Sequence, residues 1–305
     1  MAMRVFVTGA SGYLGAAIAA RLVKGDCEVQ GLVRSEESAE LVASLGVKPV
    51  IGDLEKPETF LSDLKNNDAV VHAALRSEHE TARLDRLALE TIRAGVTDGR
   101  VRHLLYTSGV WVHGDTEGRT EDETATLHPA EYSAWRPAHE EAALDMVEQE
   151  AHVTVMRPGM VYGGIGGEFD HWFREARERK LVTYPGAGSQ HWSVVHLADV
   201  AEGYRLALEH ARGGSRYLLV DESRFTVREL AEAVARAAEA SAQPSDPAPL
   251  VEKRGAYGAA LLLDQRLTAA KARRELGWVP RHTSFVNEAP DLYGDWRAGE
   301  RTAVA

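Results

Sequence analysis

Short apolar runs alternate with amphipathic stretches through the first half of the chain. The apolar runs lie at residues 3–7, 29–33, 47–51, 68–74 and 102–107. Between them, apolar positions recur at helical spacing over residues 16–24, 36–45, 57–64 and 81–94. Strands that alternate with helices in this way build a parallel sheet covered by helices on both faces. The pattern therefore predicts an α/β fold with a doubly wound parallel sheet.

The alternation is less regular beyond Ser108. Residues 113–129 are polar and rich in turn formers, which predicts a rim around an active site. The pattern further predicts helices to about 149, over 169–178, 198–210, 226–240 and 268–276, with strands over 153–156, 193–196 and 217–220. Thr226 and Glu229 form a capping box at the start of one of these helices. Residues 241–249 have linker composition and are expected to form an exposed loop, and 268–276 is the last helix that the pattern indicates clearly.

A glycine-rich turn, Thr8 to Gly15, joins the first strand to the first helix. Gly9 permits a tight turn, Gly12 lets the backbone approach a pyrophosphate, and Gly15 lets the helix pack on the strand. Free N–H groups and the helix dipole then point at one spot and create an anion site. The strand before the turn and the helix after it predict a dinucleotide-binding Rossmann fold.

The residue after the second strand bears on which dinucleotide binds. An acid at the end of that strand would bind the ribose hydroxyls of NAD. Val33 occupies the expected place, and Arg34 follows it. Because a guanidinium binds phosphate oxygens with two parallel hydrogen bonds, Arg34 favours NADP. Asp53 and Leu54, after the third strand, are expected to contact the adenine.

Composition excludes several classes of protein. The net charge of −11 disfavours a nucleic-acid or anionic-membrane partner. The single cysteine, Cys27, permits no disulfide within the chain and fits a reducing compartment. The sequence has no apolar segment long enough to span a bilayer, and the first strand begins too early for a signal peptide. We therefore expect a cytoplasmic protein that acts on a small molecule.

The twelve histidines raise the question of a metal site. They show no metal-ligand spacing such as a pair four residues apart on one helix, and the cysteine has no partner. We therefore expect no metal. Histidine side chains also titrate near neutral pH, so four of them are candidates for an additional acid: His113, His171, His191 and His196.

Six ordered motifs resemble those of the extended short-chain dehydrogenases/reductases. They are Thr8–Gly15, His72-Ala73-Ala74, Tyr106–Gly114, Met156–Gly163, Val195–Val200 and Lys271–Pro280. The resemblance covers nearly the whole chain. It implies a Rossmann domain over 1–160, to which segments around 192–220 return, and a mainly substrate-binding lobe over 161–305. It also implies a possible homodimer, paired through the helices near 81–94 and 130–149.

The resemblance also implies the cofactor contacts. These are Gly9, Ser11, Gly12, Tyr13, Leu14, Gly15, Arg34, Asp53, Leu54, Ala73, Ala74, Thr107, Tyr132, Arg136, Pro158, Gly159 and Met160.

The catalytic positions depart from the family pattern. The family uses a tyrosine acid/base and a lysine four residues later, whose charge lowers the pKa of the tyrosine from its ordinary value of about 10. Here Tyr132 is followed by Arg136, which cannot give up a proton as lysine can. Pro137 is expected to disturb the helix that spaces the pair. Arg136 either replaces the lysine or points to solvent, in which case another group such as His113 protonates the product.

Two further positions also depart from the pattern. The hydroxyl of the fifth strand falls on Gly109, so Ser108 lies one residue early and faces the site only if the strand end bends. Met160 replaces an asparagine that contacts phosphate in nucleotide-sugar members of the family. Met160 and four apolar or aromatic residues that follow it in the sequence predict a more apolar substrate pocket. These four residues are Val161, Tyr162, Trp172 and Phe173.

Three functions remain open. The preferred one is NADP(H)-dependent reduction of a carbonyl in a small, fairly apolar metabolite, with Tyr132, Arg136 and Ser108 as catalytic residues. The second is a nucleotide-sugar epimerase or dehydratase, which retains its cofactor and consumes no added NADPH. The third is a catalytically silent NADP-binding protein that reports redox state to a partner.

Overall fold

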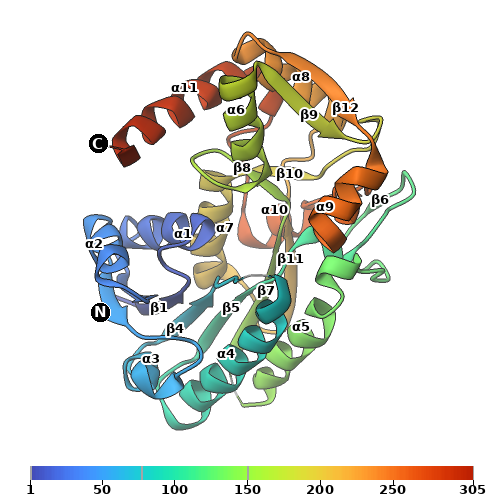
Figure 1. Ribbon diagram of the computed structural model, residues 1–305. Coiled ribbons are helices and arrows are strands. Elements are labelled where there is room, and N and C mark those ends of the chain that lie inside the picture. Colours follow the sequence, from blue (N-terminus) through green and yellow to red (C-terminus); the bar gives the residue numbers. More distant parts are fainter. Residues whose placement is uncertain (1, 77, 150, 305) are drawn as a thin grey trace.

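A seven-stranded parallel sheet forms the centre of the larger part of the molecule in the computed structural model, which describes residues 2–76, 78–149 and 151–304. The strand order is β11-β7-β5-β4-β1-β2-β3 (Figure 1). The strands are β1 (Arg4–Thr8), β2 (Glu28–Val33), β3 (Lys48–Ile51), β4 (Ala69–His72), β5 (His103–Thr107), β7 (His152–Pro158) and β11 (Ser215–Leu219). The doubly wound Rossmann fold expected from the sequence is confirmed.

Helices cover both faces of this sheet because successive strand side chains point to opposite sides. On β1, Val5 and Val7 pack toward one face, whereas Phe6 packs toward the other. The first face is covered by α1 (Tyr13–Val23), α2 (Glu36–Ser44), α7 (Leu197–His210) and α10 (Ala270–Leu276). The second face is covered by α3 (Leu61–Lys65), α4 (Glu78–Asp98) and α5 (Arg136–Leu144).

A second core lies above the sheet in Figure 1 and is rich in aromatic side chains. Trp172 stacks on Trp192 with 5.3 Å between the ring centroids, and both side chains are buried. The surrounding elements are β8 (Met160–Tyr162), α6 (Gly167–Arg179), β9 (Leu181–Pro185), β10 (Val194–His196), α8 (Val227–Ala237), β12 (Ser241–Ser245), α9 (Pro247–Ala260) and α11 (Phe285–Val304). A short pair, β6 (Thr120–Glu121) and β13 (Arg266–Leu267), completes the strands.

Three expectations about the elements are wrong. Residues 241–249 are not a loop: β12 pairs with β9 and α9 follows, because Asp246 caps that helix and Pro247 fits its first turn. The pattern also missed α11, although Phe285, Ala289 and Trp296 recur at helical spacing and are buried. The helix expected over 57–64 is split into a 3₁₀ turn, η1 (Pro57–Thr59), and α3.

The strand order fixes where a ligand binds. The chain proceeds from β1 to β2 on one side, whereas β4 lies on the other side of β1. A crevice opens at such a point beyond the carboxyl ends of the strands, and ligands of doubly wound sheets bind in it. Among the described residues, no helix has the length and apolar character needed to cross a membrane.

Candidate active site

A cavity of about 390 Å³ lies at this point of the sheet. Of the expected cofactor contacts, it is lined by Gly9, Ser11, Gly12, Tyr13, Leu14, Arg34, Asp53, Leu54, Ala73, Ala74, Thr107, Arg136 and Pro158. Val33, which occupies the expected place of the ribose-binding acid, also lines it, and the sequence did not indicate five other lining residues: Leu32, Ser38, Gly52, Leu75 and Arg76. Gly15 does not line the cavity. A side chain at Gly15 would lie 2.1 Å from the Gly9 carbonyl oxygen, so this glycine permits close packing of α1.

The glycine turn suits a pyrophosphate. Gly9 has φ of 72°, and a Cβ there would lie 2.7 Å from the Ala73 carbonyl oxygen at the end of β4. Gly12 is the N-cap of α1 and supplies no side-chain cap. The first N–H groups of the helix therefore keep the donors that bind an anion.

Two arginines, Arg34 and Arg76, line this cavity together with Arg136. Arg76 lies 3.3 Å from a carboxylate oxygen of Asp53 and 3.5 Å from one of Glu55. Arg34 is exposed, and none of the hydrogen bonds or ion pairs found among the described residues involves it. Its guanidinium is therefore available to a phosphate.

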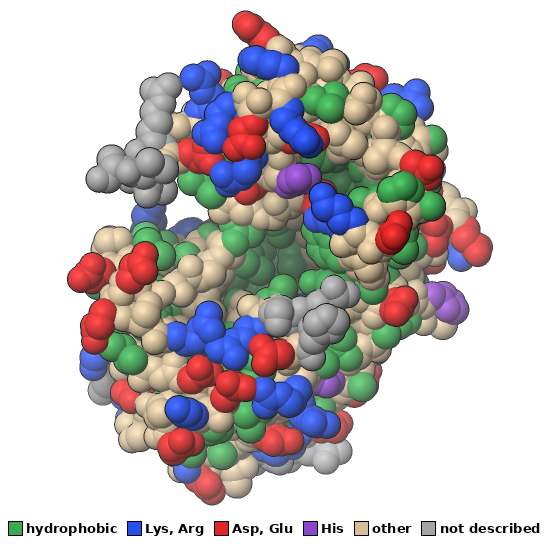
Figure 2. Space-filling model, viewed as in Figure 1, with side chains coloured by type: hydrophobic (Ala, Val, Ile, Leu, Met, Phe, Trp, Pro, Cys, Tyr) green, Lys and Arg blue, Asp and Glu red, His purple; other side chains and the backbone are tan. Residues whose placement is uncertain are grey.

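A second cavity of about 260 Å³ adjoins the first, and both are lined by Tyr13, Leu14, Leu75, Ser108, Arg136 and Pro158. The second cavity is also lined by Gly109, Val110, Trp111, Tyr132, Ser133, Gly159, Met160, Val161, Gly167, Glu168 and Tyr257. Figure 2 shows the hollow between the two parts of the molecule, with hydrophobic side chains on its inner surface. A cofactor-sized cleft thus opens into a smaller, mostly apolar pocket.

Tyr132 lies in the wall of the second cavity, within a cluster of three aromatic rings. Its ring meets Trp111 edge-on at 5.4 Å and Tyr257 at 5.3 Å, and Trp111 meets Tyr257 at 5.2 Å between centroids. Tyr132 belongs to a 3₁₀ turn, η3 (Glu131–Ser133), that precedes α5. The cluster fixes the plane of the Tyr132 ring.

Arg136 lies where the two cavities meet. It begins α5, and Pro137 occupies the first turn, where proline is tolerated. Pro137 therefore lies at the start of α5, and the α-helix does not extend back over Tyr132, which belongs to the separate turn η3. As the sequence predicts, one continuous helix does not space Tyr132 and Arg136. Arg136 Nη1 donates to the Thr107 carbonyl oxygen at 3.0 Å, and the guanidinium lies 4.5 Å from the Trp135 ring centroid. These contacts hold the cation at the end of β5.

Ser108 lines both cavities and is 5% exposed. Its Oγ has no hydrogen-bond partner among the described residues. β5 ends at Thr107, so the side-chain alternation of the strand does not govern the direction of Ser108. Since a buried hydroxyl without a partner is costly, Ser108 Oγ is suited to bind a polar atom of a ligand.

The structure corrects the expected substrate pocket in part. Met160 and Val161 line the second cavity. Tyr162, Trp172 and Phe173 instead pack inside the second core and are fully buried. Their size and apolar character serve packing, which the sequence cannot distinguish from a pocket wall.

The candidate acid His113 is fully buried away from the cavities. Its Nε2 lies 3.2 Å from Arg157 Nη1, and Arg157 forms a buried ion pair with Glu140. Burial and the Arg157 charge lower the pKa of His113 to about 4. His113 is therefore neutral near pH 7 and does not contact either cavity, so it is not the acid that protonates a product.

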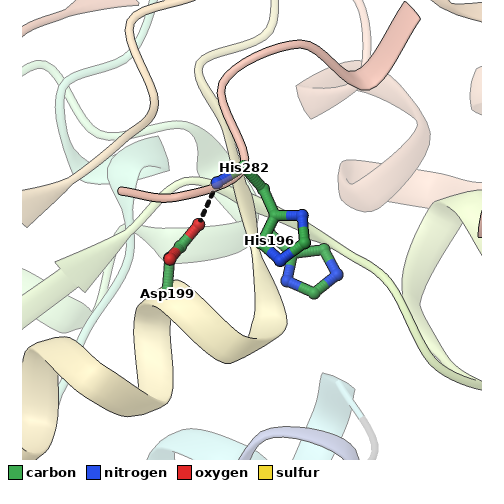
Figure 3. Close-up of side chains that lie close together, drawn as sticks. All are labelled: His196, Asp199 and His282. Carbon is green, nitrogen blue, oxygen red and sulfur yellow. Dashed lines mark hydrogen bonds between the residues drawn. The ribbon is translucent and has the colours of Figure 1, made fainter. Parts of the chain in front are cut away.

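Three described residues have potential metal-ligand atoms within 4.8 Å of one another: His196, Asp199 and His282 (Figure 3). The two imidazoles stack with centroids 3.7 Å apart. Both Asp199 oxygens accept backbone N–H groups, from Arg281 and His282, and His196 Nδ1 accepts the Ala198 N–H at 3.1 Å. The two Asp199 contacts join α7 to the segment before α11.

The fold and the cleft define a dinucleotide-dependent enzyme. Residues 5–219 match the NAD-dependent epimerase/dehydratase family, and the chain belongs to that family. It is 31% identical over 313 residues to 4-hydroxy-2-methyl-3-oxo-4-farnesyl-3,4-dihydroquinoline-1-oxide ketoreductase from Stigmatella aurantiaca. This alignment covers 92% of this chain and 93% of that protein.

Two further comparisons span the full length. A Schizosaccharomyces pombe protein, C2A9.02, is 29% identical over 95% of this chain and 100% of its own length. The dTDP-glucose 4,6-dehydratase DesIV from Streptomyces venezuelae, solved with NAD bound, superposes with a TM-score of 0.83 over 98% of each chain at 21% identity. The ketoreductase relative and the family match indicate an NAD(P)-dependent oxidoreductase class, and the likeness to DesIV shows the fold.

Proposed function

We propose that this protein is an NADPH-dependent reductase of a carbonyl group in a small, largely apolar molecule. The observation that carries the proposal is Ser108 Oγ, which is buried where the two cavities meet and has no hydrogen-bond partner in the described part of the chain. Tyr132 and Arg136 lie in the walls of the same pocket. The ketoreductase relative supports the same reaction class.

Each residue has a defined role in this proposal. Bound NADPH supplies the hydride that reduces the carbonyl carbon. Ser108 Oγ donates a hydrogen bond to the carbonyl oxygen and stabilises its developing charge. Tyr132 gives its hydroxyl proton to that oxygen, so that the carbonyl becomes an alcohol. Arg136 places a fixed positive charge near Tyr132 and lowers the cost of ionising the phenol.

The test is NADPH oxidation by the purified protein against a panel of aryl and alkyl ketones and aldehydes. With a substrate found in this way, Ser108→Ala should lower kcat/KM by about 10²–10³, the cost of removing one oxyanion donor. The exposed Ser44, whose hydroxyl bonds the Leu41 carbonyl in α2, provides a matched Ser→Ala control with parental kinetics. A Ser108→Ala variant with parental kcat/KM would contradict the assigned role.

NADP is the proposed cofactor. Arg34 lines the cofactor cavity as an exposed guanidinium and is suited to a 2′-phosphate. We expect NADPH to bind at least about tenfold tighter than NADH, a difference of about 1.4 kcal/mol, and Arg34→Ala to remove that preference. Fluorescence titration with both cofactors measures the ratio. A ratio near one in the parent protein contradicts the argument.

An epimerase or dehydratase and a silent NADP-binding sensor can each be distinguished from a reductase by experiment. A nucleotide-sugar epimerase or dehydratase fits the fold of DesIV, but Met160 offers no hydrogen-bond donor to a substrate phosphate. That function predicts a retained cofactor and no net NADPH consumption. A silent NADP sensor is suggested by Arg136 in place of lysine and Gly109 in place of the strand hydroxyl, and it predicts binding without turnover.

We also propose a homodimer that pairs through α4 and α5. Leu89 and Ile92 of α4 are buried against the chain's own sheet, whereas Ala134, just before α5, and Ala138, on α5, are exposed and small. Sedimentation velocity at micromolar concentration should show a dimer, and Ala138→Glu should yield a monomer. A monomeric parent protein contradicts the proposal.

A further inference from the structure

The second cavity has a buried carboxylate in its wall. Glu168 is in the first turn of α6, is 5% exposed, and lines the second cavity but not the cofactor cavity. Its Oε1 and Oε2 accept hydrogen bonds from Arg254 Nη1 and Nη2, each at 2.8 Å. Tyr257 donates its hydroxyl to Oε2 at 3.0 Å. A carboxylate is thus held in place beside a pocket that is otherwise mainly apolar.

The ion pair presents its negative end to the pocket. Glu168 is a lining residue, whereas Arg254 is not. Among the described residues, Oε1 accepts one hydrogen bond and Oε2 accepts two. Since each carboxylate oxygen has two acceptor positions, Oε1 retains one for a ligand. The other charged residue of the lining, Arg136, lies at the end shared with the cofactor cavity.

Tyr257 and Arg254 hold this carboxylate through α9. The helix is interrupted at Gly255, where φ is 55° and ψ is −142°, which lets Tyr257 reach the cavity while Arg254 stays outside it. The Arg254 guanidinium lies 4.5 Å from the Tyr257 ring centroid. Burial and the Glu168 charge raise the pKa of Tyr257 far above its ordinary value, so this phenol keeps its proton and remains a donor.

We propose that Glu168 determines substrate specificity: it selects carbonyl compounds that carry an N–H or O–H donor at the end remote from the carbonyl and rejects compounds with a carboxylate there. Tyr257 and Arg254 are positioning residues for that selection. A substrate carboxylate would meet a carboxylate of like charge in a site with little water, and this repulsion disfavours its binding. The inference rests on the proposed function, because that function places the reacting carbonyl at Ser108.

The test compares an aryl ketone bearing a primary amide with the same ketone bearing the free acid. The two are nearly isosteric, and the acid is ionised at about pH 8. In the parent protein the amide should have at least about tenfold higher kcat/KM. Glu168→Gln, which is also isosteric, should reduce that ratio to about two or less. Arg254→Gln weakens the attachment of α9 but keeps the carboxylate, so it should lower both kcat/KM values and preserve the amide preference.

A binding measurement keeps this test independent of turnover. Trp111 forms part of the pocket wall, so its fluorescence should report occupancy by either compound in the NADP-loaded protein. Tighter binding of the amide supports the inference even if no ketone is reduced, in which case only the proposed function fails. Equal affinities in the parent protein, or an amide preference that survives Glu168→Gln, overturn the inference. If Glu168→Gln fails to bind NADPH, the ratio of amide to acid affinity in the parent protein decides: a ratio near one overturns the inference.

Discussion

At the scale of single residues, the proposed active site has Arg136 where the family resemblance predicts lysine, and this arginine has a fixed place. The Thr107 carbonyl and the Trp135 ring hold the guanidinium beside both cavities. Arginine supplies charge and donors as lysine does, but it cannot release a proton near neutral pH. Arg136 is therefore suited to the electrostatic part of the lysine role and excluded from proton transfer.

Substitutions at Arg136 separate these two parts. Arg136→Lys should keep or raise kcat, whereas Arg136→Met should lower it by about 10²–10⁴, the usual contribution of acid–base catalysis. Tyr132→Phe should cost a similar factor. Because both changes disable one proton transfer, their effects should not add in the double variant, as steady-state kinetics would show. An Arg136→Met enzyme within a few-fold of the parent, together with an active Tyr132→Phe, would require another acid.

The sequence predicted those site residues that share a motif. The glycine turn, Arg34, Asp53 and the residues after β4 each follow a strand, and parallel strands end at one edge. Glu168 and Tyr257 belong to no such motif. They are 89 positions apart in the sequence, and the fold brings the first turn of α6 and α9 within hydrogen-bond distance. A buried glutamate in a helix gives no pattern that distinguishes it from a solvated one.

At the scale of elements, the same local signal has two meanings. The prolines and serines of 241–249 are typical of a loop, yet Pro244 lies on β12, which pairs with β9 alone. Proline is tolerated on an edge strand because its missing N–H faces away from the partner. Strands of the central sheet were predicted well because they are buried on both faces and read as continuous apolar runs.

Asp221, just after β11, makes the stability of the fold depend on pH, which the sequence does not indicate. Asp221 is 7% exposed, its N–H bonds Val194 on β10, and its Oδ2 has no partner among the described residues. Burial, followed by the charges of Glu288 and Asp199, raises the pKa of Asp221 to about 6. The folded state therefore binds this proton more tightly than the unfolded state, and the stabilisation is lost as pH rises through about 6.

Asp221→Asn should consequently stabilise the protein at high pH. Above about pH 7 the parent buries a charged carboxylate, and a shift from 3.8 to about 6 corresponds to about 3 kcal/mol. The variant should have a higher melting temperature than the parent at about pH 8, with the difference shrinking toward about pH 4. His113 and His196, whose pKa values are lowered to about 4, act in the opposite direction. The difference between variant and parent at each pH is therefore the measurement, and a constant difference contradicts the argument.

At the scale of the whole molecule, the sheet and the second core meet across the cleft through Tyr13. Its hydroxyl donates to the Gly163 carbonyl oxygen at 2.7 Å. Gly166 has φ of 143°, and a Cβ there would lie 2.6 Å from Tyr13 Cδ2. The glycines before α6 thus let the backbone surround the ring of a residue from the nucleotide motif. We therefore predict that retention of a cofactor in the cleft depends on this contact.

Weakening the contact should speed cofactor release. Tyr13→Phe keeps the ring and loses one hydrogen bond of about 0.5–1.5 kcal/mol, so the Kd for NADPH should rise about 2- to 10-fold. Gly166→Ala should have a larger effect, because the added methyl group collides with the ring and the backbone is strained. Gly118→Ala is the matched control: Gly118 also has positive φ, but a Cβ there meets no described atom within 4 Å. Stopped-flow measurement of NADPH release compares all three variants with the parent protein.

Two outcomes would contradict this argument. If Gly118→Ala releases NADPH as fast as Gly166→Ala, backbone strain rather than the contact with Tyr13 controls release. If Gly166→Ala releases NADPH no faster than the parent, the contact with Tyr13 does not control release.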